Sequence, residues 1–600
     1  MASSLPRCGL PAAERAKGGV TVSFGGSREL QPSLRDRIAA RRAGRLRRAP
    51  LFRLRPEPRS IGDVIRGQRL LAGRFDLGGH HVSAPERAPW DLPLQPREFE
   101  AALHGFGWLD DLAALGTREA RGRARDWTQG WIARFGTGRG PGWTAQLAGR
   151  RVMRWIHHAL MLRDPADEAA NAALCRALGR QTRFLAARWT AAPEGLARFE
   201  ALAGLIHGAA VLEGLERHLD PARAALEAEC AARIDAQGGI ATRNPEELLE
   251  ILALLIWMQD ILAECGAEAG PECAAAIARI APVLRALRHA DASLARFHGG
   301  GRGEIGRLEH ALAAAGTREA PGDARAMGYA RLAAGRTTVI VDAERPPEPR
   351  ESHGAHASTL AFELTSGRRP VVVSCGAGRG FGPDWLRAAR ATPAHSTLAI
   401  EAVSSSRFGP AGRREADARL PLMERPGAVS HERRDAPHAT GLLLGHDGYF
   451  ATHGLTHLRR LDLSADGRAL TGEDMLAVIT AADRRRFARY RAAYPGRPVN
   501  FGVRFHLHPD IDATLQAGVV TLRLPSGEVW QFEQEGARAI TLAPSVYLER
   551  GRVAPQPTVQ IVLSGQVGMA AGQVNWTLAK AADTPVAVRD LAHDDMPIEA

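Results

Sequence analysis

The sequence predicts a two-domain α and β protein, in which an array of helical hairpins is followed by an antiparallel β-sandwich. The chain has 600 residues, several times what a single hydrophobic core usually supports. Residues 95–290 repeat apolar side chains three and four positions apart, which is the spacing of amphipathic helices. After residue 325, short runs rich in Val, Thr, Leu and Phe alternate with turn residues, as in strands joined by hairpins.

The chain begins with a basic segment. We expect residues 1–60 to form a flexible N-terminal arm. Within it, residues 35–48 read RDRIAARRAGRLRR, a weakly amphipathic stretch that could contact nucleic acid or a membrane. The simpler interpretation, which we favour, is a solvated arm that can be helical, so no nucleic-acid partner is expected.

Residues 61–325 are expected to form the helical domain. Segments such as 150–162, 199–219 and 245–264 have the helical period, and short breaks rich in Gly, Pro and Asp separate them, as in stacked helical hairpins. The segment 246–262 is apolar around much of its circumference, which suits a helix buried between neighbours.

The β-sandwich is expected over residues 326–585 and a flexible tail over 586–600. The texture changes at Gly328 and Tyr329, and beyond this point runs of period two recur with breaks of hairpin length. TTVIVDA, NFGVRFHLHP and TVQIVLSGQ are examples. Many short strands at this spacing favour two packed antiparallel sheets.

The formal net charge of +12 allows two interpretations. Lys17 and Lys580 are the only lysines, so arginine carries the excess, as a coding bias would produce. Alternatively, the charge creates a positive field that attracts an acidic polymer. The six cysteines form no CxxC pair, which argues against a zinc ribbon and a disulfide framework. No signal peptide is visible at the N-terminus, and the longest strongly apolar run, Ile251 to Met258, is too short to cross a bilayer.

A series of landmarks resembles the heparinase II/III-like family of bacterial polysaccharide lyases over residues 90–580. They read GLIHGAAVLEG, GGIATRNPE and RHADASLARFHG in the helical half, and GYARLAAGRTTVIVD, AHASTLAFELTSGRRPVVVSCG, ARATPAHSTL and VRFHLHP in the sandwich. The resemblance implies an (α/α) toroid joined to a sandwich. It also implies a cleft between them that holds an acidic polysaccharide containing uronic acid and cleaves it by β-elimination, in the periplasm or cell envelope. The absence of a visible signal peptide points instead to the cytoplasm.

Eliminative cleavage needs a group that neutralises the sugar carboxylate, a base for the C5 proton and an acid for the leaving oxygen. The resemblance implies His207 as the histidine of the family's Asn-His motif, but Ile206 stands where the amide should be. It places Glu246 or Glu247 where the family has its catalytic tyrosine, and no tyrosine precedes Tyr329.

The two glutamates have a second interpretation. At the start of a helix, acidic side chains interact favourably with the helix dipole, which needs no catalytic role. If either glutamate acts as the base, burial or a neighbouring carboxylate must raise its pKa, and an arginine nearby such as Arg243 would oppose this. We assign Arg243, Asn244 and Trp257 to substrate binding. Eight of the eleven tryptophans lie in the helical half, where most of them are expected in the core.

In the sandwich, the segment Ser352-His353-Gly354-Ala355-His356 resembles the family's His-x-His element. The resemblance implies His356 and His395 as ligands of a structural zinc ion, with Ser374 in place of the expected Asp. His353 lies one residue from the catalytic position, which falls on Gly354. Two imidazoles without the carboxylate make a weakened zinc site, and a pair of buried, hydrogen-bonded histidines is the alternative, so no cofactor is assigned with certainty.

Two functions remain open from the sequence. The first is a polysaccharide lyase with His207, Glu246, Glu247 and His353 in catalysis. The second is a catalytically impaired relative that binds acidic polysaccharide in envelope or exopolysaccharide metabolism. The first function requires six side chains to converge between the two domains, and failure to converge would favour the second. These side chains are His207, Arg243, Glu247, His353, His356 and His395.

Overall fold

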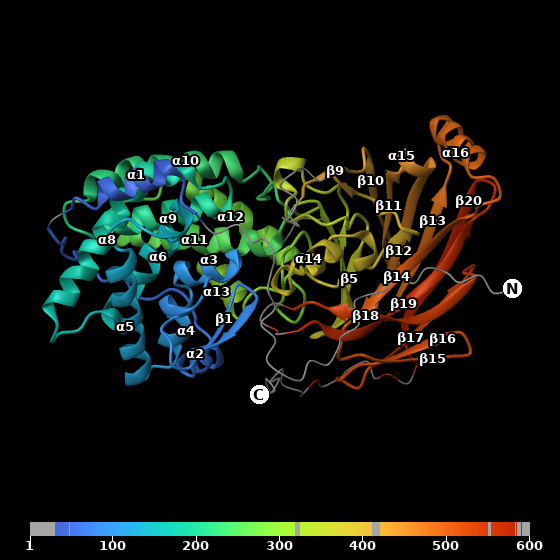
Figure 1. Cartoon of the computed structure of the whole chain (residues 1–600). Helices are drawn as coiled ribbons and strands as arrows, with labels where there is room; N and C mark the ends of the chain where they lie inside the picture. The colour runs from blue at the N-terminus through green and yellow to red at the C-terminus, as the bar shows by residue number, and fades with distance from the viewer. Residues whose placement is uncertain are drawn as a thin grey trace.

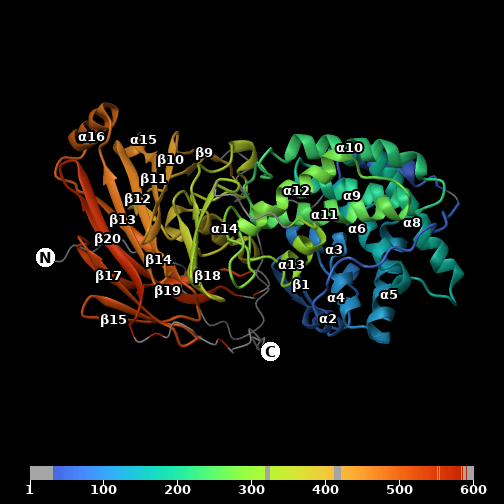
Figure 2. The same cartoon turned by 180° about the vertical axis from the view of Figure 1, so that it is seen from behind.

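The computed structural model describes residues 31–46, 48–317, 325–410, 420–549, 552, 554–582, 584 and 590. Most helices gather in one half of the molecule and the two large sheets in the other (Figure 1). The helices α14 (Pro383–Ala389), α15 (Phe450–His453) and α16 (Ala481–Ala493) lie in the half that holds the large sheets. The view from behind shows the same two halves meeting along one seam (Figure 2). Each half has its own hydrophobic core. The predicted fold class is therefore confirmed.

The helical half contains thirteen α-helices among its described residues. They are α1 (Leu34–Ala43), α2 (Val64–Leu71), α3 (Arg97–Gly105), α4 (Trp108–Ala114), α5 (Arg118–Phe135), α6 (Ala145–His157), α7 (Ala159–Leu162), α8 (Glu168–Arg188), α9 (Leu196–Val211), α10 (Leu219–Arg233), α11 (Pro245–Glu264), α12 (Pro271–Ala286) and α13 (Arg307–Ala314). Helix α9 packs against α6, α8, α10 and α11.

Helix α11 lies at the centre of this array. Asn244 caps its N-terminus by accepting hydrogen bonds from the backbone N–H groups of Glu246 and Glu247, and Pro245 occupies the first turn, where no N–H is needed. The helix packs against α9, α12 and α13, so most of its circumference is buried. This is the arrangement expected for the apolar segment 246–262.

The basic N-terminal stretch differs from a free arm. Residues 34–43 form α1, which packs on α8 through the buried Ala40 and Ala43. Asp36 Oδ1 accepts a hydrogen bond from Arg188 Nε at 2.8 Å. An amphipathic helix of a globular protein buries one stripe, and here alanines provide it while the arginines face outward. Residues 1–30 lie outside the described residues.

A short hairpin lies between α2 and α3, where the sequence analysis assigned no strand. Strands β1 (Arg74–Leu77) and β2 (His80–Ser83) pair through a two-residue Gly78-Gly79 turn. Both glycines have positive φ, of 60° and 83°, which a tight hairpin turn of this kind requires.

The second half is a sandwich of two large antiparallel sheets. The first runs in the order β10 (Val429–Ala436), β11 (Ala439–Tyr449), β12 (Leu455–Ser464), β13 (Ala469–Ala477), β20 (Ala571–Lys580), β17 (Val529–Glu535), β16 (Val519–Arg523) and β15 (Asp512–Gln516). The second runs β18 (Ala539–Tyr547), β19 (Gln556–Val567), β14 (Val499–Leu507), β6 (Arg369–Val373), β5 (Phe362–Ser366), β4 (Thr337–Asp342) and β3 (Tyr329–Ala334), with β7 (Leu398–Ile400) paired to β14. Strand β3 begins at Tyr329, where the sequence texture changes.

Aromatic residues join the two sheets. Trp576 of β20 stacks on Phe362 of β5 with ring centres 5.8 Å apart and planes at 6°. The indole of Trp576 donates a hydrogen bond to Asp474, which also accepts from His457 and Arg459. All four polar side chains are fully or almost fully buried. This network satisfies its own polar groups, so it stabilises the core without reaching the seam.

Two further observations concern the chain as a whole. Among the described residues, no helix combines the length and apolar character needed to cross a bilayer. Of the expected tail, only Asp590 is described, and its carboxylate forms an ion pair with Arg369 at 2.8 Å. The rest of residues 586–600 lies outside the described residues.

Candidate functional site at the domain seam

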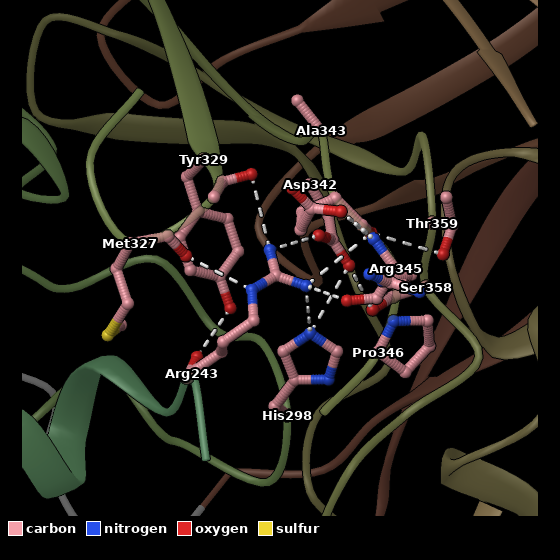
Figure 3. Close-up of polar contacts among 12 residues, drawn as sticks. Arg243, His298, Met327, Tyr329, Asp342, Ala343, Arg345, Pro346, Ser358 and Thr359 are labelled. Carbon is pink, nitrogen blue, oxygen red and sulfur yellow. Dashed lines mark hydrogen bonds and ion pairs between the residues drawn. The ribbon is translucent and has the colours of Figure 1, made fainter. Parts of the chain in front are cut away.

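The seam is held by an ion pair between Arg243, in the loop before α11, and Asp342, at the end of β4. Arg243 Nη2 donates to Asp342 Oδ1 at 2.6 Å, and Figure 3 shows the guanidinium enclosed by side chains and carbonyls of the sandwich. Arg243 is 8% exposed and Asp342 is fully buried. The backbone at Arg243 has φ 52°, an uncommon value for a non-glycine residue, so the loop is held in a specific conformation.

The donors of Arg243 are already engaged. Its Nε donates to the carbonyl of Met327 at 3.0 Å, Nη1 to that of Arg345 at 2.8 Å and Nη2 to that of Gly328 at 3.2 Å, besides the bond to Asp342. A guanidinium has no acceptor and a fixed set of N–H donors. Arg243 therefore fastens the helical domain to the sandwich, and its predicted role in substrate binding stays a prediction.

His298 and Ser358 complete the environment of Asp342. Ser358 donates to Asp342 Oδ2 at 2.7 Å, and His298 Nε2 lies 3.4 Å from the same oxygen. The backbone N–H of His356 donates to His298 Nδ1, which leaves Nε2 as the protonated nitrogen facing the carboxylate. Burial by itself would raise the pKa of Asp342, but Arg243 and His298 hold it well below its ordinary value.

Tyr329 is the first tyrosine of the chain, and it is part of the same junction. Its hydroxyl donates a 2.6 Å hydrogen bond to the backbone carbonyl of Arg243, and the guanidinium lies over its ring at 4.7 Å. The side chain is 2% exposed, and burial raises the pKa of the hydroxyl well above its ordinary value. Tyr329 therefore supports the Arg243 loop and is not placed to remove a proton from a ligand.

The start of α11 brings Asn244, Glu246 and Glu247 to the same seam. Asn244 caps the helix through its amide oxygen, and its predicted role in substrate binding stays a prediction. Glu246 accepts a hydrogen bond from the backbone N–H of Gly301 at 2.9 Å. Glu247 accepts from Thr242 at 3.0 Å, and burial raises its pKa. Of these three predicted residues, Glu247 keeps a property that general-base chemistry requires.

Arg379 is a seam residue that the sequence analysis missed. It lies in the short 3-10 helix η5 (Arg379–Phe381) of the sandwich domain, and its charge lowers the pKa of Glu247, opposing the effect of burial. Its side chain is exposed, as is that of the nearby His353 in the turn after Glu351. The negative charge of Glu351 raises the pKa of Glu247. The seam thus presents an exposed arginine and histidine beside a half-buried glutamate.

His207 does not reach the seam. It lies on α9 inside the helical domain, where Nε2 is 3.1 Å from His157 Nε2 and Nδ1 donates to the carbonyl of Ala203 at 2.7 Å. The side chain is 1% exposed, and burial lowers its pKa to about 4. His207 is therefore a buried, neutral imidazole within the helical core, and its predicted catalytic role stays a prediction.

Trp257 also belongs to the helical core. It is 4% exposed, packs against His157, and lies between the guanidinium groups of Arg154 and Arg307. One edge borders a cavity of about 160 Å³ between α11 and α13. The residues that line this cavity come from the helical half and the segment just before it, and the predicted role of Trp257 in substrate binding stays a prediction.

The three residues predicted as metal ligands do come together. His395 Nδ1 is 3.1 Å from Ser374 Oγ, and the rings of His395 and His356 lie 5.1 Å apart. Burial lowers the pKa of His395 to about 3 and that of His356 well below its ordinary value, so both imidazoles are neutral, as metal ligation requires. Both ring nitrogens of His356 and Nε2 of His395 have no hydrogen-bond partner.

The donor set is nevertheless small. In the part of the chain that the structure describes, no group of three or more His, Cys, Asp and Glu side chains lies where it could hold a metal ion. Structural zinc is almost always four-coordinate, whereas two imidazoles and the Ser374 hydroxyl offer fewer and weaker ligands. These residues therefore do not fit a structural zinc ion as they stand, and zinc remains a prediction.

The comparisons with known proteins now bear on this geometry. A family profile described as Heparinase II/III-like, C-terminal matches residues 316–577. Over 536 residues the chain is 33% identical to FtsZ-localized protein C of Caulobacter vibrioides, covering 88% of this chain and 89% of that protein. The chain belongs to the heparinase II/III-like family.

Solved structures of this family share the two-domain fold. A crystal structure of heparinase III superposes with a TM-score of 0.66 at 12% identity, over 91% of this chain and 89% of the other. A heparan sulfate lyase mutant from Pedobacter heparinus superposes with a TM-score of 0.56 at 13% identity, over 91% and 88% of the two chains. These superpositions establish the heparinase-like fold. At such low identities the chemistry has to be argued from the residues of this chain.

Proposed function

We propose that this heparinase II/III-like protein binds an acidic polysaccharide at the seam between its two domains and does not cleave it. The engagement of every Arg243 donor by the protein itself carries the proposal. A lyase needs a cation or amide free to neutralise the sugar carboxylate. Here Ile206 occupies the amide position, and Tyr329 is buried against Arg243.

Binding of an acidic polymer is supported by two exposed side chains beside the seam. Arg379 and His353 are exposed beside the seam, and the chain has a net charge of +12. An arginine recognises a carboxylate or sulfate through paired hydrogen bonds, which needs geometry but no proton transfer.

A second candidate, a polysaccharide lyase with an altered base, is favoured by Glu247. Burial raises its pKa, which is the change that turns a carboxylate into a better base near neutral pH. In this reading Glu247 removes the proton and Arg379 neutralises the sugar carboxylate. The two candidates share the ligand and differ in turnover.

The relative from Caulobacter vibrioides is named for its localisation with FtsZ. We propose that the present chain acts at the same place in its own cell, since the two proteins are similar over almost their whole length. A fluorescently tagged chain that does not coincide with FtsZ in dividing cells would contradict this placement.

Replacing Arg379 with Ala is expected to weaken the binding of an acidic polysaccharide about tenfold, the effect of losing one charge-assisted hydrogen bond worth about 1.5 kcal/mol. Equilibrium binding of labelled heparan, chondroitin and alginate chains at low salt measures this. The control is Arg434→Ala, which removes an exposed arginine paired with Glu432 on the edge strand β10. Equal affinities for wild type and both variants would contradict binding at the seam.

A further inference from the structure

The β1–β2 hairpin reaches from the helical domain to the sandwich. It lies beside α3, α4 and α13 on the side of the helical half that faces the seam (Figures 1 and 2). Its base is held by Asp76, whose carboxylate pairs with Arg69 at 2.9 Å and with His81 at 2.6 Å. Gly78 packs against the backbone of Glu98, where a Cβ would lie 2.3 Å from the carbonyl oxygen. The hairpin therefore has an anchored base and a tip made of two glycines.

The tip touches the sandwich backbone to backbone. A Cβ added to Gly79 would lie 2.1 Å from Cα of Gly380, and a Cβ added to Gly380 would lie 3.2 Å from Cα of Gly79. A Cβ at Gly79 would clash with Gly380, and the positive φ of Gly79 also favours glycine, whereas a Cβ at Gly380 would be tight against Gly79. Because a contact between two glycines buries little apolar surface, we expect the repulsion from a methyl group added at this contact to outweigh it.

Gly380 is the central residue of η5, and its neighbour is Arg379. An atom at the Cβ position of Gly354, next to His353, would lie 3.8 Å from Arg379 Nη2. Arg379 also acts on the pKa of Glu247 in the helical domain. The hairpin tip thus rests on the one segment that carries Arg379 to the seam.

We infer that the β1–β2 hairpin is a clasp that closes the seam over Glu247 and Arg379. In the closed state the tip holds η5 in place, and Arg379 faces Glu247 across the domain boundary. A polymer chain enters the seam only after Gly79 leaves Gly380. The identity of that polymer rests on the proposed function, whereas the closing contact does not.

The clasp is tested without any ligand, by hydrogen exchange of backbone amides followed by mass spectrometry. Gly380→Ala places a methyl group against the hairpin tip, and Gly79→Ala does so from the other side. Both variants are expected to speed exchange at least tenfold in peptides covering 242–247 and 351–356. Peptides from α8 and β20, away from the seam, are expected to exchange as in the wild type.

The matched control is Gly116→Ala. Gly116 also has positive φ, 63°, but a Cβ there would meet no atom within 4 Å, so this variant carries the backbone strain without the clash. If Gly79→Ala fails to fold, Gly380→Ala still tests the clasp. Gly380 has no positive φ, and a Cβ there would lie farther from the hairpin than a Cβ at Gly79 would lie from η5. Exchange unchanged from wild type at 242–247 and 351–356 in Gly380→Ala would overturn the clasp.

Polysaccharide binding measured on the same variants separates the two proposals. Faster exchange together with faster polymer association supports both the clasp and the binding function. Faster exchange in a protein that binds no acidic polymer retains the clasp and removes the binding function. Wild-type exchange in a protein that does bind removes the clasp alone.

Discussion

Replacing Asp342 with Asn is expected to lower the free energy of unfolding by about 3–5 kcal/mol, because it leaves a buried guanidinium without its carboxylate. Asp342 is fully buried and is the only acidic side chain hydrogen-bonded to Arg243 among the described residues. Asn keeps the size of the side chain but cannot neutralise Arg243. The loss should appear in denaturant-induced unfolding followed by tryptophan fluorescence and by circular dichroism.

The control for this prediction is an exposed ion pair. Arg433 and Asp435 on β10 lie 3.1 Å apart, with side chains 33% and 59% exposed. Pairs of this kind contribute little because water screens them, so Asp435→Asn should change the free energy of unfolding by less than about 1 kcal/mol. Equal losses for Asp342→Asn and Asp435→Asn would show that the seam ion pair does not fasten the domains.

Acid is expected to destabilise the protein steeply between pH 6.5 and pH 4. Burial lowers the pKa of His207 and of His506 to about 4, against about 6.5 in an unfolded chain. Between these pH values the histidines are protonated in the unfolded state but not in the folded state, so the free energy of unfolding falls as the pH falls. Each such histidine accounts for on the order of 3 kcal/mol by pH 4.

The acid effect is measured by urea unfolding at a series of pH values. The slope of the unfolding free energy against pH gives the number of protons bound on unfolding. In this window His506→Gln is expected to lower that number by up to one, since Gln does not titrate. His438→Gln serves as the control, because this side chain lies in the exposed turn between β10 and β11. A slope that His506→Gln leaves as steep as in the wild type would show that the buried histidine is not its source.

Much of the fold could be predicted from the sequence because local patterns reflect it. The helical period of 95–290, the apolar 246–262 segment and the change at Tyr329 correspond to α3–α12, the buried α11 and the first strand of the sandwich. The β1–β2 hairpin was missed, although a Gly-Gly pair between residues 77 and 80 is a known turn signal. Residues 34–43, which form α1, were expected to be solvated because the stripe that they bury consists of alanines, which are only weakly apolar.

The candidate site was only partly predictable, for a physical reason. His356, His395, Ser374 and Glu247 were named because the resemblance placed them at family positions. The roles of Arg243 and His207 depend on tertiary partners, Asp342 and His157, which lie 99 and 50 residues away along the chain. A local sequence pattern does not show whether the N–H donors of an arginine are already bonded within the folded protein. Arg379 and His298 are isolated in the sequence, and only the fold brings them to the seam.

The central claim is that the seam holds an acidic polysaccharide without breaking it. The most direct measurement incubates the purified protein with heparan, chondroitin, alginate and bacterial uronic-acid polymers and follows the near-ultraviolet absorbance of the unsaturated sugar that β-elimination creates. We expect no absorbance above that of a Glu247→Gln variant, with polymer binding intact in both. Absorbance that grows with wild-type protein and disappears with Glu247→Gln would contradict the claim and establish the lyase.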